Sequence, residues 1–199
     1  QFASVGEECQ DKKFAGEPTR LEIGDNNVIR ESCTIHRGTT QDQGLTSIGS
    51  GNLFMAYVHV AHDCVIGNDS IFANSTTLAG HVHVADHVIL GGATMVHQFC
   101  RIGLHSMSAG GSIVLRDIPA FVMASGQSAS AHGLNTEGLK RRGFSSELIL
   151  ELKRAYKIVY RKGLKLSEAL EQLSAISSEI PEVAVFTDSI KNSNRGIIR

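Results

Sequence analysis

The chain has 199 residues, 42% of them hydrophobic, with 20 glycines and no tryptophan, a composition typical of a folded globular protein. A formal net charge of -1 argues against a nucleic-acid partner, and no run of about 18 apolar residues predicts a membrane span. No charged-then-apolar leader opens the sequence, so we expect a cytoplasmic protein.

The first residues already look like part of a repeat. The chain begins at Gln1 without a methionine, and residues 2–6 resemble the pattern found further along, so we expect additional coils upstream in a longer parent chain. Two segments, 7–22 and 41–47, then interrupt the pattern. Insertions in a repeat fold form loops at its corners, often on the binding face, and we predict that these two loops border a site.

Residues 48–119 divide into twelve six-residue repeats, and all but one open with an aliphatic or aromatic residue. The openers are Ile48, Phe54, Val60, Ile66, Phe72, Leu78, Val84, Leu90, Val96, Ile102, Ser108 and Val114. The second place is Gly or Ala in nine of the twelve, as a tight corner requires. A six-residue period fits neither an amphipathic helix nor an alternating strand and is typical of a parallel β-helix, which we predict for residues 1–134.

Three repeats per coil would stack residues eighteen apart in sequence on one face, about 4.8 Å from one another. By this spacing Cys64 and Cys100 lie two coils apart, about 10 Å, which is too far for a disulfide. We expect both to be small buried residues of a reducing compartment.

From Asn135 the period ends and helical signals begin, which predicts a helical domain over residues 135–199. We expect Ser145 to cap a helix that ends at Arg161 or Lys162, Ser167 to cap a second helix, and Pro181 to open a third.

The eighteen-residue spacing places Gly80 directly over His62, about 5 Å away, and Gln98 over Gly80. An imidazole beside a backbone N–H without a side chain is a candidate general base next to an oxyanion donor. Asp63 follows His62 and is a candidate for orienting it, although neighbouring strand residues usually point apart. For one solenoid histidine alone, a surface or structural role would be the commoner assignment.

A zinc site is the main alternative for the histidines, since trimeric solenoids of the γ-carbonic anhydrase type hold zinc with three of them. His81, His83 and His87 have a suitable density, but their places in the repeat put them on different faces of the coil. One chain cannot bring them together, so no metal site is predicted.

A second polar cluster, residues 135–142, lies where the solenoid gives way to helix. It contains three successive cations, Lys140, Arg141 and Arg142. Arginine forks suit a phosphate or an acidic carrier, and a solvated helix start would look similar.

The strings IHRGT (35–39), VAHDC (60–64), LAGHV (78–82), VHQFC (96–100) and GLKRRGF (138–144) closely resemble the UDP-N-acetylglucosamine O-acyltransferase family, which begins lipid A biosynthesis. The resemblance covers essentially the whole chain. It implies a left-handed β-helix that forms a homotrimer with active sites in the clefts between subunits. It also implies transfer of an (R)-3-hydroxyacyl group from acyl carrier protein to the glucosamine 3-hydroxyl of UDP-N-acetylglucosamine, without a cofactor or covalent acyl-enzyme.

By matching position, His62 corresponds to the family's general base and the Gly80 N–H to its oxyanion donor. The resemblance implies substrate contacts for Asp11, Lys13, His36, His59, His81, His97, Gln98, Asn135, Glu137, Arg141 and Arg142. It implies that Gly110 limits acyl length, with the chain running past Gly92 and Met107. The preferred acyl length and a 3-amino acceptor stay open.

Three other functions compete with this assignment. The later N-acyltransferase of the same pathway shares the solenoid and a catalytic histidine, but the string at 138–144 argues against it. Coenzyme-A-dependent hexapeptide acetyltransferases form the second alternative. The third is a purely structural or binding solenoid, in which the clustering of histidine and arginine would be coincidental.

Overall fold

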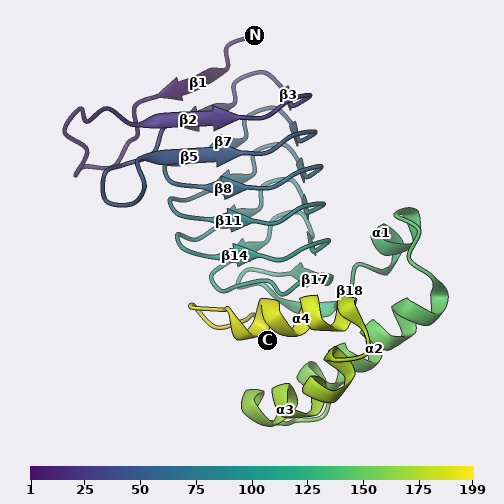
Figure 1. Cartoon of the computed structure of the whole chain (residues 1–199). Coiled ribbons are helices and arrows are strands. Elements are labelled where there is room, and N and C mark those ends of the chain that lie inside the picture. The colour runs from purple at the N-terminus through teal and green to yellow at the C-terminus, as the bar shows by residue number, and fades with distance from the viewer.

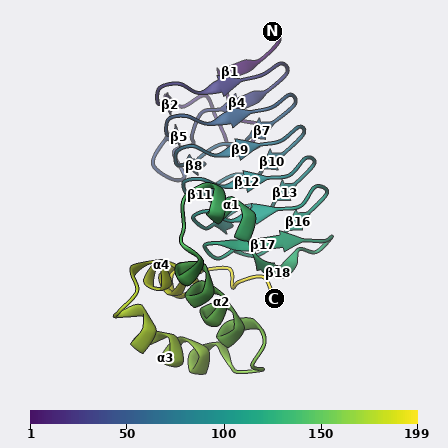
Figure 2. The same ribbon diagram turned by 90° about the vertical axis from the view of Figure 1, so that its right-hand side faces the viewer.

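The computed structural model describes residues 1–199 and forms a three-sided, left-handed parallel β-helix with helices at its C-terminal end (Figure 1, Figure 2). Sheet A contains β1 (Ser4–Glu7), β4 (Thr34–His36), β7 (His59–Val60), β10 (Thr77–Leu78), β13 (Met95–Val96) and β16 (Ile113–Val114). Sheet B contains β2 (Arg20–Ile23), β5 (Leu45–Ile48), β8 (Val65–Ile66), β11 (His83–Val84) and β14 (Arg101–Ile102). Sheet C contains β3 (Val28–Ile29), β6 (Leu53–Phe54), β9 (Ile71–Phe72), β12 (Ile89–Leu90), β15 (Met107–Ser108), β17 (Val122–Ser125) and β18 (Ser130–Leu134).

The strand register confirms the eighteen-residue coil. Leu78 in β10 pairs with Val60 on one side and with Val96 on the other. The repeat openers point inward and are buried, and the exceptional opener Ser108 is buried too. Its hydroxyl lies 2.8 Å from that of Thr94, so the polar atom is satisfied inside the core. Cys64 and Cys100 are buried and free, as predicted, and so are the other two cysteines.

The turns between sheets form three corners, which we call AB, BC and CA after the sheets they join. In each corner the fourth residue of the repeat adopts a left-handed backbone, as in Asp63 (φ 57), His87 (φ 59) and Ala93 (φ 55). The small second place has a different cause from the predicted one. A Cβ on Gly91 would lie 2.6 Å from the backbone nitrogen of Gly110 in the next coil, so close approach between coils, not a positive φ, excludes a side chain there.

Both insertions end earlier than predicted. Strands β2 and β5 begin at Arg20 and Leu45, inside the segments expected to be loops, and pair with each other over four residues. Both insertions lead into sheet B in neighbouring coils. The residues just before the usual two-residue strands can therefore also pair with each other, which makes β2 and β5 four residues long. Figure 1 shows the two remaining loops projecting from the same edge of the solenoid.

The helices are α1 (Thr136–Arg141), α2 (Ser146–Tyr160), α3 (Leu166–Ser177) and α4 (Pro181–Lys191). Ser145 caps α2 by accepting from the Leu148 N–H at 3.2 Å, and Pro181 opens α4, both as predicted. The predicted cap at Ser167 is wrong because α3 begins at Leu166, two residues before the start that a cap at Ser167 would give. Its N-cap is Lys165, whose N–H donates to the Glu168 carboxylate at 3.0 Å.

The helices share one hydrophobic core with the end of the solenoid. Leu139, Leu152, Leu173 and Phe186, one from each helix, are fully buried. Figure 2 shows α2, α3 and α4 gathered beyond the last coil, which they cover. None of the helices combines the length and the apolar character needed to cross a membrane.

Candidate active site

His62 and Asp63 lie in corner AB, in the turn between β7 and β8. The sequence makes Asp63 a candidate for orienting His62, although neighbours in an extended strand would point apart. Because Asp63 has a left-handed backbone (φ 57), its side chain turns toward the imidazole instead, and Asp63 Oδ2 lies 2.8 Å from His62 Nδ1. The turn therefore forms the orienting contact directly.

The Asp63 carboxylate is buried and surrounded by donors. Thr39 donates both its backbone N–H, at 2.7 Å, and its hydroxyl, at 2.6 Å, to this carboxylate. A carboxylate with these partners is an acceptor, so His62 Nδ1 carries the proton of their shared hydrogen bond. The other ring nitrogen, Nε2, is then left with a lone pair that can accept a proton.

Gly80 lies over His62, as the register predicts. A Cβ on Gly80 would sit 2.5 Å from His62 Cε1 and 2.7 Å from Nε2, so a side chain there would displace the imidazole. The Gly80 N–H donates to no backbone or side-chain acceptor, while the flanking Ala79 and His81 N–H groups both bond to the neighbouring coils. A free donor beside a ring nitrogen can stabilise an oxygen that gains negative charge.

The two insertions add carboxylates to corner AB. Asp11 in the first insertion places Oδ2 3.8 Å from His62 Nε2, and Asp42 in the second places Oδ2 3.2 Å from His81 Nδ1. The His81 ring meets His62 edge-on at 5.1 Å between centroids and stacks on Phe99 at 4.5 Å. Thr39, Asp42 and Phe99 were not among the predicted site residues; the insertion at 41–47 was the signal for Asp42.

His36, at the end of β4, lies one coil before His62, and His59 in β7 lies three residues before His62 in the same coil, at the entry to the same corner. Their rings meet edge-on at 5.0 Å, and the Thr34 hydroxyl lies 2.6 Å from His59 Nδ1. Burial lowers the pKa of both histidines, and the neighbouring histidine ring lowers that of His59 further. Both rings are therefore neutral hydrogen-bonding groups near neutral pH.

The remaining predicted residues of this corner follow from the same register. His97 and Gln98 occupy the turn after β13, one coil beyond Gly80, and His97 Nδ1 lies 3.1 Å from the Gln98 carbonyl. Lys13 donates its backbone N–H to the Asp11 carboxylate at 2.9 Å, which shapes the first insertion. The structure thus gathers Asp11, Lys13, His36, His59, His62, Asp63, Gly80, His81, His97 and Gln98 around corner AB or its loops.

The cluster at residues 135–142 lies elsewhere, at corner BC. Asn135 is buried; its amide donates to the His105 carbonyl at 3.1 Å and accepts from the Gly138 N–H at 3.1 Å, so it holds α1 on the solenoid. Glu137 pairs with Lys140, and Arg142 reaches His87. Within one chain, Asn135, Glu137, Arg141 and Arg142 are separated from His62, and Figure 1 shows α1 on the opposite side of the solenoid from the insertions.

The predicted acyl-length residues lie near the third corner. Gly92 and Gly110 stack in corner CA, where a Cβ on Gly110 would lie 3.3 Å from the Gly92 carbonyl oxygen, and Met107 points outward from sheet C. A path from His62 to Gly110 therefore crosses the width of sheet A as well as rising along the axis. The rise along the axis alone therefore underestimates the distance from His62 to Gly110.

The structure places the three histidines considered for zinc apart. His81 lies at corner AB, His83 in β11 and His87 at corner BC. A different set, His62, Asp63 and His81, has one donor atom from each residue within 4.8 Å of the others. Both Asp63 oxygens in this set already accept hydrogen bonds, and the arrangement is a hydrogen-bond network.

Comparisons with known proteins agree on one family. Residues 117–198 match the model of UDP N-acetylglucosamine O-acyltransferase domain 2, and residues 45–80 match the six-repeat bacterial transferase hexapeptide model. The acyl-(acyl-carrier-protein)–UDP-N-acetylglucosamine O-acyltransferase of Thiobacillus denitrificans is 60% identical over 198 residues, covering 100% of this chain and 77% of the relative. The corresponding enzyme of Pseudomonas paraeruginosa is 58% identical with the same coverage.

Solved structures give the same result. The UDP-N-acetylglucosamine O-acyltransferase of Moraxella catarrhalis superimposes with a TM-score of 0.97 at 54% identity, covering 100% of this chain and 77% of that one. The acyltransferase of Francisella novicida superimposes with a TM-score of 0.98 at 44% identity, covering 100% and 73%.

Proposed function

This chain belongs to the UDP-N-acetylglucosamine O-acyltransferase family and is an acyltransferase, and we propose from that premise that it moves an (R)-3-hydroxyacyl group from acyl carrier protein to the glucosamine 3-hydroxyl of UDP-N-acetylglucosamine. This reaction would open lipid A biosynthesis in the cytoplasm. The observation that carries the proposal is the unpaired Gly80 N–H beside the His62 ring, because one supplies an oxyanion donor and the other a base.

His62 acts as general base in this proposal. Its Nδ1 proton is held by Asp63 at 2.8 Å, so Nε2 takes the proton of the 3-hydroxyl as that oxygen attacks the thioester carbonyl. The C–S bond then breaks, and the thiol of the carrier leaves with a proton that His62 returns. No covalent acyl-enzyme forms, and no cofactor or metal takes part.

The Gly80 N–H stabilises the tetrahedral intermediate. The thioester carbonyl oxygen gains negative charge during attack, and a preorganised backbone donor costs no reorganisation at that moment. Only glycine fits at this place because a Cβ would lie 2.5 Å from His62 Cε1. The same residue therefore provides the donor and leaves the space for the base.

Two copies of the chain would complete each site. The polar residues of corner AB and the arginines near corner BC lie at different corners of one chain. In a homotrimer with cyclic symmetry, corner AB of one subunit can face corner BC of the next. We assign Asp11, Lys13, His36, His59, His81, His97 and Gln98 to acceptor contacts, and Asn135, Glu137, Arg141 and Arg142 to the nucleotide or the carrier across the cleft.

The acyl chain runs from corner AB toward Gly110 across the outer face of sheet A. Gly92 and Gly110 leave corner CA without side chains, and Met107 borders it from sheet C. A glycine at this place permits a long acyl chain, and a larger residue would shorten the available groove.

An assay of the purified chain tests the reaction. Acyl carrier proteins charged with 3-hydroxyacyl groups of several lengths are incubated with UDP-N-acetylglucosamine or with its 3-amino analogue. The expected product is the 3-O-acyl sugar nucleotide from the carrier thioester and little product from the coenzyme A thioester. Preferential acylation of the 3-amino analogue would favour an N-acyltransferase, and transfer from coenzyme A alone would favour the acetyltransferase alternative.

A further inference from the structure

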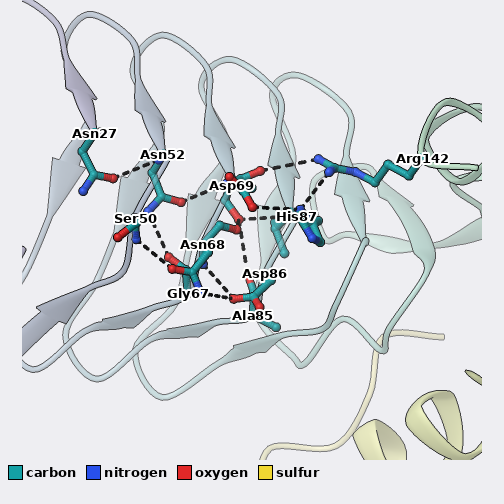
Figure 3. A network of polar contacts seen from close by, with 12 residues as sticks. Asn27, Ser50, Asn52, Gly67, Asn68, Asp69, Ala85, Asp86, His87 and Arg142 are labelled. Carbon is teal, nitrogen blue, oxygen red and sulfur yellow. Dashed lines mark hydrogen bonds and ion pairs between the residues drawn. The ribbon is translucent and has the colours of Figure 1, made fainter. Parts of the chain in front are cut away.

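Arg142 reaches from the end of α1 to the solenoid and contacts His87 at corner BC (Figure 3). Its Nη1 lies 2.8 Å from His87 Nδ1, and its Nη2 lies 3.5 Å from the Asp69 carbonyl. A guanidinium can only donate, so His87 Nδ1 must accept, and this nitrogen is unprotonated when the contact forms. The contact therefore depends on the protonation state of His87.

The His87 ring is fixed by its surroundings. Its backbone is left-handed (φ 59) and its ring stacks on His105 with centroids 4.7 Å apart and planes 15° from parallel. His105 in turn stacks on Phe121 and meets Phe144 edge-on at 5.1 Å. The acceptor atom of His87 thus has a fixed place, which is the requirement for orienting a flexible arginine.

The turns beneath His87 are also held by polar side chains. Figure 3 shows the ladder in which Asn68 accepts from the Ser50 N–H at 2.8 Å and Asp86 accepts from the Asn68 N–H at 2.7 Å. These bonds link three successive coils at corner BC. His87, which Arg142 contacts, is therefore held by the solenoid, whereas Arg142 itself follows the short helix α1.

Arg142 differs in this respect from its neighbour. Arg141 lies on α1 and is exposed, and its side chain makes no hydrogen bond or ion pair within the chain. Arg142 is exposed as well, yet its guanidinium is tied to His87. An arginine without such a tie loses rotamer freedom when it binds an anion, and a preoriented one loses less.

We propose that His87 is a positioning residue that, in its neutral form, holds the Arg142 guanidinium ready for a substrate phosphate and releases it on protonation. This inference rests on the proposed function, which assigns Arg142 to an anionic substrate. The phosphate belongs either to the sugar nucleotide or to the thioester arm of the acyl carrier protein. Both substrates would present a phosphate to Arg142, and they are distinguished by which of the two KM values changes when His87 is altered.

The groups facing His87 determine the effect of a proton. Asp69 Oδ2 lies 3.8 Å from His87 Nδ1, Asp86 precedes His87 in the same turn, and Arg142 approaches from α1. His105 stays neutral because burial, then the charges of His87 and Arg142, lower its pKa to about 4. Protonation of His87 removes the acceptor for Arg142, places two positive groups in contact, and favours a shift of the ring toward Asp69.

Two variants separate hydrogen bonding from packing. His87→Asn keeps an acceptor near the position of Nδ1, tolerates a left-handed backbone and cannot be protonated. His87→Phe keeps the stack on His105 and loses the acceptor. We expect His87→Phe to raise KM about three- to tenfold with kcat nearly unchanged, and His87→Asn to retain a KM close to wild type. His132→Phe, in the exposed hairpin, is the matched control.

The pH profile gives the second readout. The KM of the wild type should rise as the pH is lowered and His87 gains a proton, and that of His87→Asn should stay flat, while kcat changes alike in both. A rise in the KM for UDP-N-acetylglucosamine alone assigns Arg142 to the nucleotide, and a rise in the KM for the acyl carrier protein alone assigns it to the carrier. Equal KM profiles for wild type and His87→Asn would overturn the inference.

A binding measurement keeps the inference separate from the proposed reaction. If the wild type transfers no acyl group, the proposed function fails, and binding of UDP is still measurable by calorimetry. Weaker UDP binding in His87→Phe with full binding in His87→Asn supports the positioning role at the nucleotide. If transfer proceeds but neither KM nor UDP binding changes in folded His87→Phe, judged by its melting temperature, the positioning role is wrong.

Discussion

His81 and His87 lie six residues apart in one coil and have nearly the same backbone, with φ of 60 and 59. Both stack on an aromatic ring in the next coil, Phe99 at 4.5 Å and His105 at 4.7 Å. Their partners have opposite charge: Asp42 approaches His81 at 3.2 Å, and Arg142 approaches His87 at 2.8 Å. The corner geometry is thus common to the repeat, and the chemistry comes from the added segments.

The added segments differ in kind at the two corners. The insertions bring Asp11 and Asp42 to corner AB, where Asp63 is already buried, and so surround the imidazoles with acceptors. Helix α1 brings arginine to corner BC. Corner AB, rich in acceptors, can remove a proton, and corner BC, with its arginines, can bind phosphate. The two functions are complementary, but the two corners are separated within one chain.

Removal of the imidazole at corner AB should have the largest effect. His62→Ala is expected to lower kcat about 10²- to 10⁴-fold because His62 is the imidazole that lies against Gly80 and is oriented by the buried Asp63 carboxylate. Steady-state acyl transfer measures the loss, and the oligomer mass and melting temperature should be unchanged. Activity of His62→Ala within threefold of His132→Ala would show that corner AB does not supply the base.

A methyl group at Gly80 should come next. Gly80→Ala would place a Cβ 2.5 Å from His62 Cε1, which forces the ring out of line and is expected to lower kcat by about 10²-fold. The N–H itself is kept, so the variant tests the space rather than the donor. Full activity with an intact fold would mean that the ring can move without loss, and would separate Gly80 from the chemistry.

A side chain at corner CA should change selectivity more than rate. Gly110→Met fills the place where even a Cβ would lie 3.3 Å from the Gly92 carbonyl oxygen, and the donor preference should shift toward shorter acyl chains by several-fold or more. Competition between carrier thioesters of different length measures the shift. An unchanged length profile would remove Gly110 from the acyl groove.

A fourth prediction concerns stability at corner BC. Burial lowers the pKa of His105 to about 4, below the value near 6.5 that it has in an unfolded chain, so the unfolded state takes up the proton first as pH falls. The fold should lose at most about 3 kcal/mol between about pH 6.5 and pH 4 from this residue, and His105→Phe should lose less. Urea unfolding at several pH values measures both slopes, and parallel slopes would contradict the assignment.

The sequence predicted the features that follow from periodicity. The eighteen-residue spacing placed Gly80 over His62 and kept Cys64 apart from Cys100, because each depends only on the coil length. The sequence also made Asp63 a candidate for orienting His62 but gave no geometry for the contact, which depends on the left-handed turn at Asp63. Extended-strand geometry was the wrong reference for a residue at a corner.

The contacts made by the inserted segments and by the helices could not be predicted from the sequence either. The position of Asp42 beside His81 depends on how the second insertion folds back, and that of Arg142 beside His87 depends on how α1 lies on the last coils. Neither follows from a repeat period. The predicted cap at Ser167 failed for a local reason, since the Glu168 carboxylate binds the Lys165 N–H and starts α3 earlier.

The most direct test of a site shared between corner AB of one copy and corner BC of another is complementation. His62→Ala and the double variant Arg141→Ala with Arg142→Ala are each prepared inactive, unfolded together, and refolded as mixed oligomers confirmed by native mass spectrometry. Random mixing should restore about a quarter of wild-type activity, since one interface in four joins two intact corners. Two variants of the same corner, His62→Ala and Asp63→Ala, should restore none. Mixed oligomers of the first pair without activity would show that the two corners do not act together.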